Sequence, residues 1–422
     1  MSRPHEHAEA HLTPVTRNPL LWVFVVVAGL VAFATTFSYL GAFLDPDGNA
    51  KDLPLALVNK DEGAALAGEQ VNFGDQVVDG VSAPNRQLGD AVKWTVLPSR
   101  QAALDGISKD AYFAALVVPG DFSARVLAIA QSSSGSPEPA VIEVLTNPAS
   151  GAYAGTFSQT VATKAVEQVS EVTSGQLADF LTDSGVTVTP AAARVLGQPV
   201  EAKVTIAHPI GERGGRGIAP FYFAVVLSVA GVVGTVVVSS GIDFLTGEQD
   251  LNLLGHRLRG RSRSLSPGRA WRVKLVATLA MATLGGWFAT WMAIGILGMS
   301  AGSAWKVGLF AMLGVTTSAT ITLTLLTAFG VAGELLAFFF AVVFGVPSAG
   351  GVYPVQALPS FFRFLHAWMP LRYLTDGSRA LIYFNGADLG LTRAVVVLGG
   401  YAAGAVLLGS LLAWRIDRRV AG

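Results

Sequence analysis

Five apolar stretches, each long enough to cross a lipid bilayer, constrain the fold of this chain more than any other feature of its sequence. A helix that spans the hydrocarbon core needs about 20 consecutive, mostly apolar residues. The stretches that meet this requirement are Leu20–Leu44, Ile218–Ile242, Val276–Met299, Val307–Phe329 and Ala394–Trp414. Only 14% of the 422 residues are charged, against about 25% in an ordinary soluble domain. The sequence therefore predicts an α-helical polytopic membrane protein.

The next apolar stretch, Leu335–Val346, is too short to span by itself, because Pro347 interrupts it. A helix of this length covers about 18 Å of a hydrocarbon core about 30 Å thick. It completes a crossing only if irregular backbone continues it, so we expect a broken fifth span. The predicted total is six spans: an anchor helix over residues 20–44 and a five-span bundle over residues 218–414.

Arginine-rich segments predict the orientation of the spans, because such segments stay on the cytoplasmic side of a membrane. Basic residues cluster in the loop over residues 243–272 and in the tail over residues 415–422. We therefore expect both termini, including residues 1–19, in the cytoplasm (N-in/C-in). Four scattered arginines would then lie outside and oppose this orientation weakly: Arg363, Arg372, Arg379 and Arg393.

Residues 45–217, between the first and second spans, are expected to form an extracellular domain. The region holds twenty acidic residues against twelve basic ones, which suits the side opposite the arginine clusters. Strand-like and helix-like segments alternate along it, which favours a mixed α/β domain. The expected strands are Leu53–Asn59, Val92–Leu97, Tyr112–Val118 and Ala140–Leu145, and the expected helices begin near Ser99, near Pro119 and Asp121, and at Ala152.

Nothing in the sequence predicts an enzyme. Cysteine is absent and the extracellular region has a single histidine, His208, so no metal-ligand spacing and no Ser–His–Asp set can be assembled. No phosphate-binding G-x-x-x-x-G-K-[ST] loop occurs. The arginine run lacks interleaved aromatic residues, which speaks against nucleic acid as a partner. We expect no catalytic residue, no cofactor and no metal, and the lipid bilayer as the surrounding medium.

The stretch GVPSAGGVYPVQALPSFF, Gly345–Phe362, combines helix breakers with apolar side chains. Irregular backbone at membrane depth is tolerated where protein buries it or a water-filled cavity solvates it. We expect an outer re-entrant region over residues 347–385, with an amphipathic helix near Leu358–Met369 that re-enters or lies along the outer leaflet. The alternative is a kinked span followed by an ordinary extracellular loop. Candidate gate residues are Pro347, Gly350, Gly351, Pro354, Pro359, Phe361 and Phe362.

A hydroxyl stripe and one acidic residue are the candidates for a transport path. Thr317, Thr320, Thr324 and Thr327 follow one face of the fourth span, and Glu334 begins the fifth. Such hydroxyls most often bond to their own helix or to a neighbour, and Glu334 could simply suit the positive end of its helix. Gating or proton coupling by Glu334 is the alternative. In the last span, Gly400 and Gly404 form a G-x-x-x-G pair, which predicts close helix packing.

The basic loop over residues 243–272 is the candidate docking site for a cytoplasmic partner. Its first half can form a short amphipathic helix with Phe244, Leu251 and Leu254 on one side, followed by a basic arm that includes Arg257 and Arg259. This element could couple the bundle to an ATPase, or it could rest on anionic lipid headgroups. The residues favour neither alternative.

Three segments of the chain are similar to those of a known family. They are LALVNKDEG after the first span, AALVVPGDFSARV in the extracellular region, and PSAGGVYPVQALPSFFRFLHAWMPLRYLTDGSRALIYFNG before the last span. On these segments the chain resembles the YhgE/Pip family, within the superfamily of ABC-2 type transporter permeases. The resemblance covers nearly the whole chain, and residues 347–385 are its most specific part.

The resemblance implies a permease subunit of an ABC-2-like exporter in the plasma membrane of a bacterium. Such a subunit works as a dimer and moves hydrophobic or amphipathic cargo out of the cell. Because this chain has no phosphate-binding loop, a separate ABC ATPase subunit would supply the ATP hydrolysis. Members of the family have also been named as phage receptors and type VII secretion accessories. A receptor-like or scaffold protein is therefore one alternative, and a proton-driven exporter is another.

Overall fold

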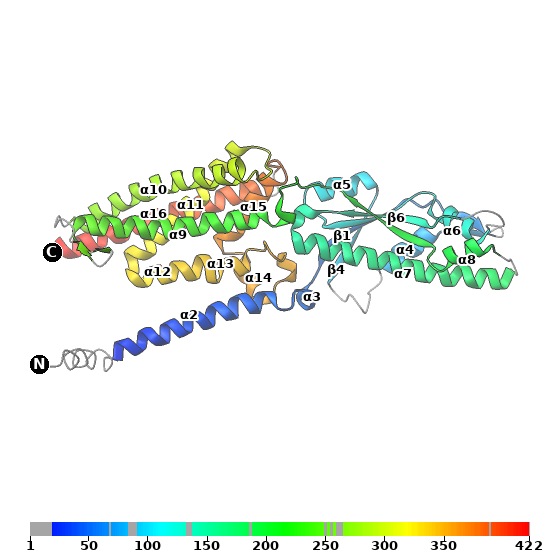
Figure 1. The fold of residues 1–422 in the computed structure, drawn as a ribbon, viewed down its shortest axis with the longest axis horizontal. Coiled ribbons are helices and arrows are strands. Elements are labelled where there is room, and N and C mark those ends of the chain that lie inside the picture. The colour runs from blue at the N-terminus through cyan, green and yellow to red at the C-terminus, as the bar shows by residue number, and fades with distance from the viewer. Residues whose placement is uncertain are drawn as a thin grey trace, which may run out of the picture.

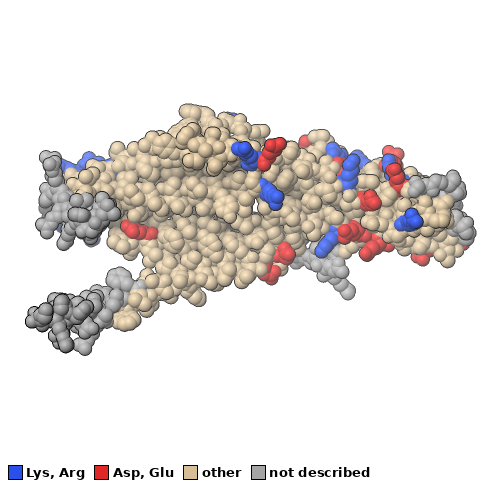
Figure 2. Space-filling model, viewed as in Figure 1, with Lys and Arg blue, Asp and Glu red and all other residues tan. Residues whose placement is uncertain are grey.

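The computed structural model describes residues 19–66, 69–82, 91–131, 137–184, 188–248, 251–253, 256–258, 265–387 and 390–421. Long helices occupy one half of the elongated molecule and a sheet domain occupies the other (Figure 1). The first described helix begins, and the last one ends, at the end of the helical half that is far from the sheet. In the view of Figure 2, charged residues gather over the sheet domain and its junction with the helices, whereas most of the helical half is uncharged.

Six helices of the described residues are long and apolar enough to cross a membrane, which supports a multi-pass membrane protein. They are α2 (Pro19–Phe43), α9 (Ala219–Thr246), α10 (Pro267–Thr290) with its π-helical continuation η3 (Trp291–Ile296), α11 (Ala304–Phe329), α12 (Val331–Phe338) with its continuation, and α16 (Leu391–Ala421). α11 is the central helix and contacts α9, α10, α12 and α16.

Glycines allow two of these helices to approach α11 closely. A Cβ atom added at Gly286 of α10 would lie 2.5 Å from the Met312 backbone nitrogen of α11. One added at Gly231 of α9 would lie 2.8 Å from the Val315 carbonyl oxygen. Small residues that let backbones meet are a main source of helix association in lipid. The α9–α11–α10 packing therefore depends on these two positions.

The fifth span corrects the sequence prediction. The helix begins at Val331 and continues through the π-helical turn η4 (Phe339–Val343) and α13 (Gly345–Ser348), so it is 18 residues long and includes Pro347. Because proline has no N–H, the carbonyl four residues earlier, that of Val343, loses its helical donor. The buried Ser38 hydroxyl of α2 donates a hydrogen bond to this carbonyl. The expected irregular backbone is present at η4 and at the turn of Phe344, but the helix continues through Pro347 to Ser348, and α2 supplies the donor that the proline lacks.

The sheet domain is built on five strands in the order β4-β1-β5-β6-β7, with a mixture of parallel and antiparallel pairs. The strands are β1 (Leu53–Asn59), β4 (Val92–Leu97), β5 (Ala114–Val118), β6 (Ala140–Thr146) and β7 (Val200–Ile206). β2 (Ala64–Leu66) and β3 (Glu69–Val71) form a separate antiparallel pair. The four predicted strands are confirmed, with β5 starting two residues later than predicted, and β7 was not predicted.

Helices α3 (Pro46–Asn49), α4 (Phe73–Ser82), α5 (Arg100–Ser108), α6 (Phe122–Ala130), α7 (Ala152–Ser184) and α8 (Pro190–Leu196) complete the domain. Ser99 caps α5 as predicted, since its hydroxyl accepts a hydrogen bond from the Ala102 amide at 3.1 Å. α7 packs against β5, β6 and β7 and confirms the long helix predicted from Ala152.

One carboxylate, that of Asp61, caps two helices of this domain. It accepts a hydrogen bond from the Gly74 amide in the first turn of α4 and from the Ser123 amide in the first turn of α6, both at 2.9 Å. The Ser123 hydroxyl also donates to it. Two segments that are distant in the sequence thus meet at this carboxylate, because Asp61 follows β1 and Ser123 follows β5.

We expect Asp61→Ala to lower the free energy of unfolding by about 2 kcal/mol, since each lost cap costs about 1 kcal/mol. Unfolding of the full chain in detergent micelles measures the difference. Asp121→Ala is the matched control, because Asp121 precedes α6 and makes no capping hydrogen bond with the described residues, so it loses only an exposed ion pair with Arg125, which contributes little. Equal losses in the two variants would contradict the assignment of the cap to Asp61.

Candidate functional site

The segment between the fifth and last spanning helices lies where the helical half meets the sheet domain (Figure 1). It contains the short turn η5 (Val355–Ala357), α14 (Ser360–His366) and α15 (Pro370–Ile382). The amphipathic helix predicted near Leu358–Met369 is α14, which is shorter than predicted, because Met369 already precedes α15. α15 packs against α9, α11 and α16, so it belongs to the core of the junction.

The structure brings the candidate gate residues together around α13 and α14. Phe362 is buried, and the rings of Phe361 and Phe362 lie 6.2 Å and 6.4 Å from that of Phe37 in α2. Pro354 and Pro359 directly precede η5 and α14. Pro347 lies inside α13, as described above. The region therefore attaches α2 to the bundle, although no observation assigns it a gating motion.

Two glycines of the same region have identifiable roles. Gly350 has a φ angle of 74°, and a Cβ atom there would lie 3.0 Å from Cε1 of His366. A Cβ atom at Gly351 would collide with the Phe221 ring of α9. Gly350 permits the turn after α13, since this φ favours glycine, and Gly351 permits close contact with α9.

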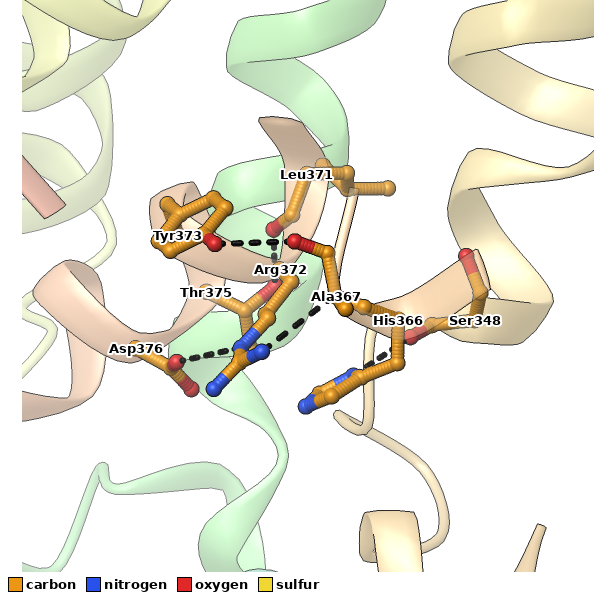
Figure 3. A network of polar contacts seen from close by, with 8 residues as sticks. All are labelled: Ser348, His366, Ala367, Leu371, Arg372, Tyr373, Thr375 and Asp376. Carbon is orange, nitrogen blue, oxygen red and sulfur yellow. Dashed lines mark hydrogen bonds and ion pairs between the residues drawn. The ribbon is translucent and has the colours of Figure 1, made fainter. Parts of the chain in front are cut away.

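A polar network lies beneath this turn (Figure 3). The His366 Nδ1 atom lies 2.7 Å from the Ser348 carbonyl oxygen, so Nδ1 carries the proton and donates it. Arg372 pairs with Asp376 one turn later, with 3.4 Å between Nε and Oδ2. The Tyr373 hydroxyl donates to the Ala367 carbonyl at 2.9 Å. These contacts join α13, α14 and α15.

An ion pair extends the network into the sheet domain. The Arg379 guanidinium of α15 donates to the Asp110 carboxylate, which follows α5 and lies 269 positions away in the sequence. The buried Asn147 amide donates to the other Asp110 oxygen at 3.3 Å. Burial raises the pKa of the Asp110 carboxyl, and the charge of Arg379 opposes this effect. Asp110 and Arg379 thus connect the two halves of the molecule.

The arginines that opposed the predicted orientation are mostly compensated locally. Arg372 pairs with Asp376 and Arg379 with Asp110. The Arg393 guanidinium lies over the Tyr373 ring, 5.7 Å from its centre, an arrangement that favours a cation. These residues were not predicted as a site. Only the i, i+4 spacing of Arg372 and Asp376 on a short helix could have indicated part of it.

His366 makes stability depend on pH. Burial, together with the nearby charge of Arg372, lowers the pKa of its imidazole from 6.5 to about 4. Between these values the unfolded chain binds more protons than the folded chain, so we expect the free energy of unfolding to fall as the pH drops from about 6.5 to 4. His366→Gln should reduce this pH dependence, measured by thermal unfolding across the window. An unchanged slope would contradict the prediction.

Two threonines of the stripe connect α11 to α16, and the other two bond only within α11. The Thr317 and Thr324 hydroxyls donate to the Leu398 and Ala405 carbonyls of α16, at 3.1 Å and 2.8 Å. Thr320 and Thr327 donate to carbonyls of their own helix at 2.8 Å each. Of the four, Thr324 also lines an apolar groove between α11 and α16. Glu334 lies half-buried in the first turn of α12, at the end far from the sheet domain.

An apolar groove of about 480 Å³ opens on the surface of the helix bundle. α11 forms its floor with Ile321 and Leu325, η4 one side with Phe340, and α16 the other from Val397 to Leu408. Gly400 and Gly404 belong to this wall, and a Cβ atom added at either would meet nothing of the described chain within 4 Å. Within the described part of the chain, no other helix therefore packs closely against this G-x-x-x-G pair, contrary to the prediction.

The predicted coupling helix is wrong. α9 continues past Phe244 and ends in a Schellman motif, with Gly247 at a φ of 77° and the Glu248 amide donating to the Asp243 carbonyl. β8 (Leu251–Leu253) and β9 (His256–Leu258) then form an antiparallel pair that includes Leu251 and Arg257. Leu254 and Arg259 lie outside the described residues.

Together these features define the class: a polytopic membrane protein with six candidate spanning helices and a mixed α/β domain between the first and the second. The chain belongs to the family described as protein of unknown function (DUF3533), whose model matches residues 24–407. No curated protein and no solved structure matches the chain.

Proposed function

We propose that this protein is the permease subunit of an ABC-2-like exporter, which moves hydrophobic or amphipathic cargo out of the cell. The observation that carries the proposal is the apolar groove of about 480 Å³ on the surface of the apolar helices. A volume of this size is typical of small-molecule sites, and the groove opens where lipid would surround the bundle. The resemblance to the YhgE/Pip family supports the same reading.

In this proposal both termini and the β8–β9 segment lie in the cytoplasm and the sheet domain lies outside, in the plasma membrane of a bacterium. The basic residues of the loop and the tail favour that orientation. ATP hydrolysis comes from a separate subunit that docks on the β8–β9 segment, and the working unit is a dimer. The region from α13 to α15 is the extracellular gate, and Thr324 contributes to the path.

Affinity purification from native membranes tests the ATPase partner. Tagged wild-type protein should recover a phosphate-loop ATPase, identified by mass spectrometry. A variant in which a Gly-Ser linker replaces residues 251–258 should recover much less of it. The proposal fails if neither bait recovers an ATPase and export of a hydrophobic dye is the same in both strains.

A proton-driven exporter is the second candidate, and the carboxylates in the junction network favour it. Asp376 and Asp110 form ion pairs with arginines near the end of the helices that adjoins the sheet domain. Protonation of either carboxylate would break its ion pair, which is the kind of step that a proton-driven exporter needs. Glu334 is the residue that the sequence indicated for this role. Export that survives both Asp376→Asn and Glu334→Gln, but stops when cellular ATP is depleted, would exclude this candidate.

A further inference from the structure

The length of the apolar groove matches one leaflet of a bilayer. On α16 its wall runs from Val397 to Leu408, a rise of about 16 Å along the helix. Half of a hydrocarbon core about 30 Å thick is about 15 Å. The wall begins six residues into α16, close to the end that adjoins the sheet domain. The groove therefore has the length and depth of an aliphatic chain in the leaflet on that side.

The polar groups in the wall are already satisfied. The Thr324 hydroxyl donates to the Ala405 carbonyl at 2.8 Å. The Tyr401 hydroxyl donates to the Trp368 carbonyl at 2.5 Å. No other lining side chain carries a hydrogen-bonding group. Neither hydroxyl therefore has a proton left to donate to an occupant, and the rest of the lining favours an apolar chain along the groove.

The groove is wide enough for a single aliphatic chain. A volume of about 480 Å³ spread over about 16 Å gives a mean cross-section of about 30 Å². A second copy that packed a helix across the open side of the groove would compete with such a chain, and the oligomeric state of the variants below distinguishes the two occupants.

A cation, Arg393, lies near the end of the groove that is closer to the sheet domain. Arg393 precedes Val397, Gly400, Gly404 and Leu408 by 4, 7, 11 and 15 residues, so all five share one helix face. Arg393 lies one turn beyond Val397, toward the sheet domain. Its guanidinium contacts the Tyr373 ring and makes no ion pair with any described residue. A negative group at the end of a bound chain would meet this charge.

We propose that the groove binds a single-chain anionic amphipath, such as a fatty acid, with its chain along α16 and its acidic group at Arg393. Charge complementarity at the mouth selects this occupant over an uncharged one. The inference deepens the proposed function by naming a class of cargo. That this ligand is transported rests on the proposed function, whereas its binding to the groove does not. Binding itself requires neither ATP nor export.

Photo-crosslinking tests the proposal on the purified full chain in lipid nanodiscs. The probe is palmitic acid that carries a diazirine in its chain, and mass spectrometry maps the labelled peptides. We expect labels on α16 and η4, displaced by excess palmitate but not by excess hexadecanol. Gly404→Leu places its side chain in the groove, where the added Cβ atom meets nothing within 4 Å, and should abolish the labelling. Gly399→Leu is the matched control, because its Cβ atom also meets nothing within 4 Å and Gly399 does not line the groove.

Arg393→Ala should raise the concentration of palmitate that displaces the probe about tenfold, the effect of one lost charged hydrogen bond, and Arg393→Lys should restore most of it. Equal labelling of Gly404→Leu and wild type would overturn the proposal, as would equal competition by hexadecanol and palmitate. A Gly404→Leu variant that changes the oligomeric state would also overturn it, because a second copy would then cover the groove. Binding without export contradicts only the proposed function, and export without binding contradicts only this inference.

Discussion

Gly286→Ala is expected to destabilise the helix bundle by about 2–3 kcal/mol, the cost of overpacking a well-packed interior. The new Cβ atom would lie 2.5 Å and 2.6 Å from the Met312 nitrogen and Cα of α11. These are backbone atoms, so no side chain can rotate away and the two helices must separate. Unfolding of the full chain in mixed micelles with increasing dodecyl sulfate measures the loss.

The neighbouring residue provides the control for this prediction. A Cβ atom at Gly285 would lie 3.9 Å from a Val315 methyl group, an ordinary contact. Gly285→Ala should therefore leave stability unchanged or raise it by up to about 1 kcal/mol, because alanine favours the helix. If the two variants lose equal stability, the close approach of α10 to α11 does not hold the bundle together.

Local patterns were sufficient to predict most of the elements. Five of the six helices follow from apolar length, and the four predicted strands follow from short apolar runs. Ser99 could be predicted as a cap because the residue it caps lies three positions away. β7 was missed although VEAKVTI alternates apolar and polar residues, a pattern that indicates a half-buried strand.

The errors concern partners that are distant in the sequence. Pro347 predicted where the helix would stop, but the helix ends only at Ser348, and Ser38, in a helix about 300 residues earlier, satisfies the carbonyl that the proline leaves without a donor. The G-x-x-x-G pair predicted packing, but its spacing cannot show whether another helix covers that face. The predicted coupling helix failed because Gly247 ends α9 in a left-handed conformation.

The candidate site was predicted only in part, for the same reason. The sequence indicated the apolar and irregular residues near Gly350, which do surround His366 in the structure. The charges that connect the junction remained unassigned, because Asp110 belongs to the sheet domain and Arg379 to α15. Pairing over such a separation depends on the docking of the two halves, which no local pattern encodes.

That pairing leads to the second large effect: Asp110→Ala should lower the free energy of unfolding by about 3 kcal/mol. Removing one partner of a largely buried ion pair leaves the other charge without compensation, and the Arg379 side chain is only 18% exposed. The Asn147 amide would also lose an acceptor. Unfolding of the full chain in detergent micelles measures the loss, and proteolysis of the sheet domain should become faster.

Two further variants separate the ion pair from a general effect of the substitution. Asp105→Ala, at an exposed position of α5, should change the free energy of unfolding by less than about 0.5 kcal/mol. The double variant Asp110→Ala/Arg379→Met should be more stable than Asp110→Ala alone, because it removes the uncompensated cation. If the double variant is the less stable of the two, Arg379 stabilises the junction by a contact other than Asp110. In that case this ion pair does not join the sheet domain to the membrane helices.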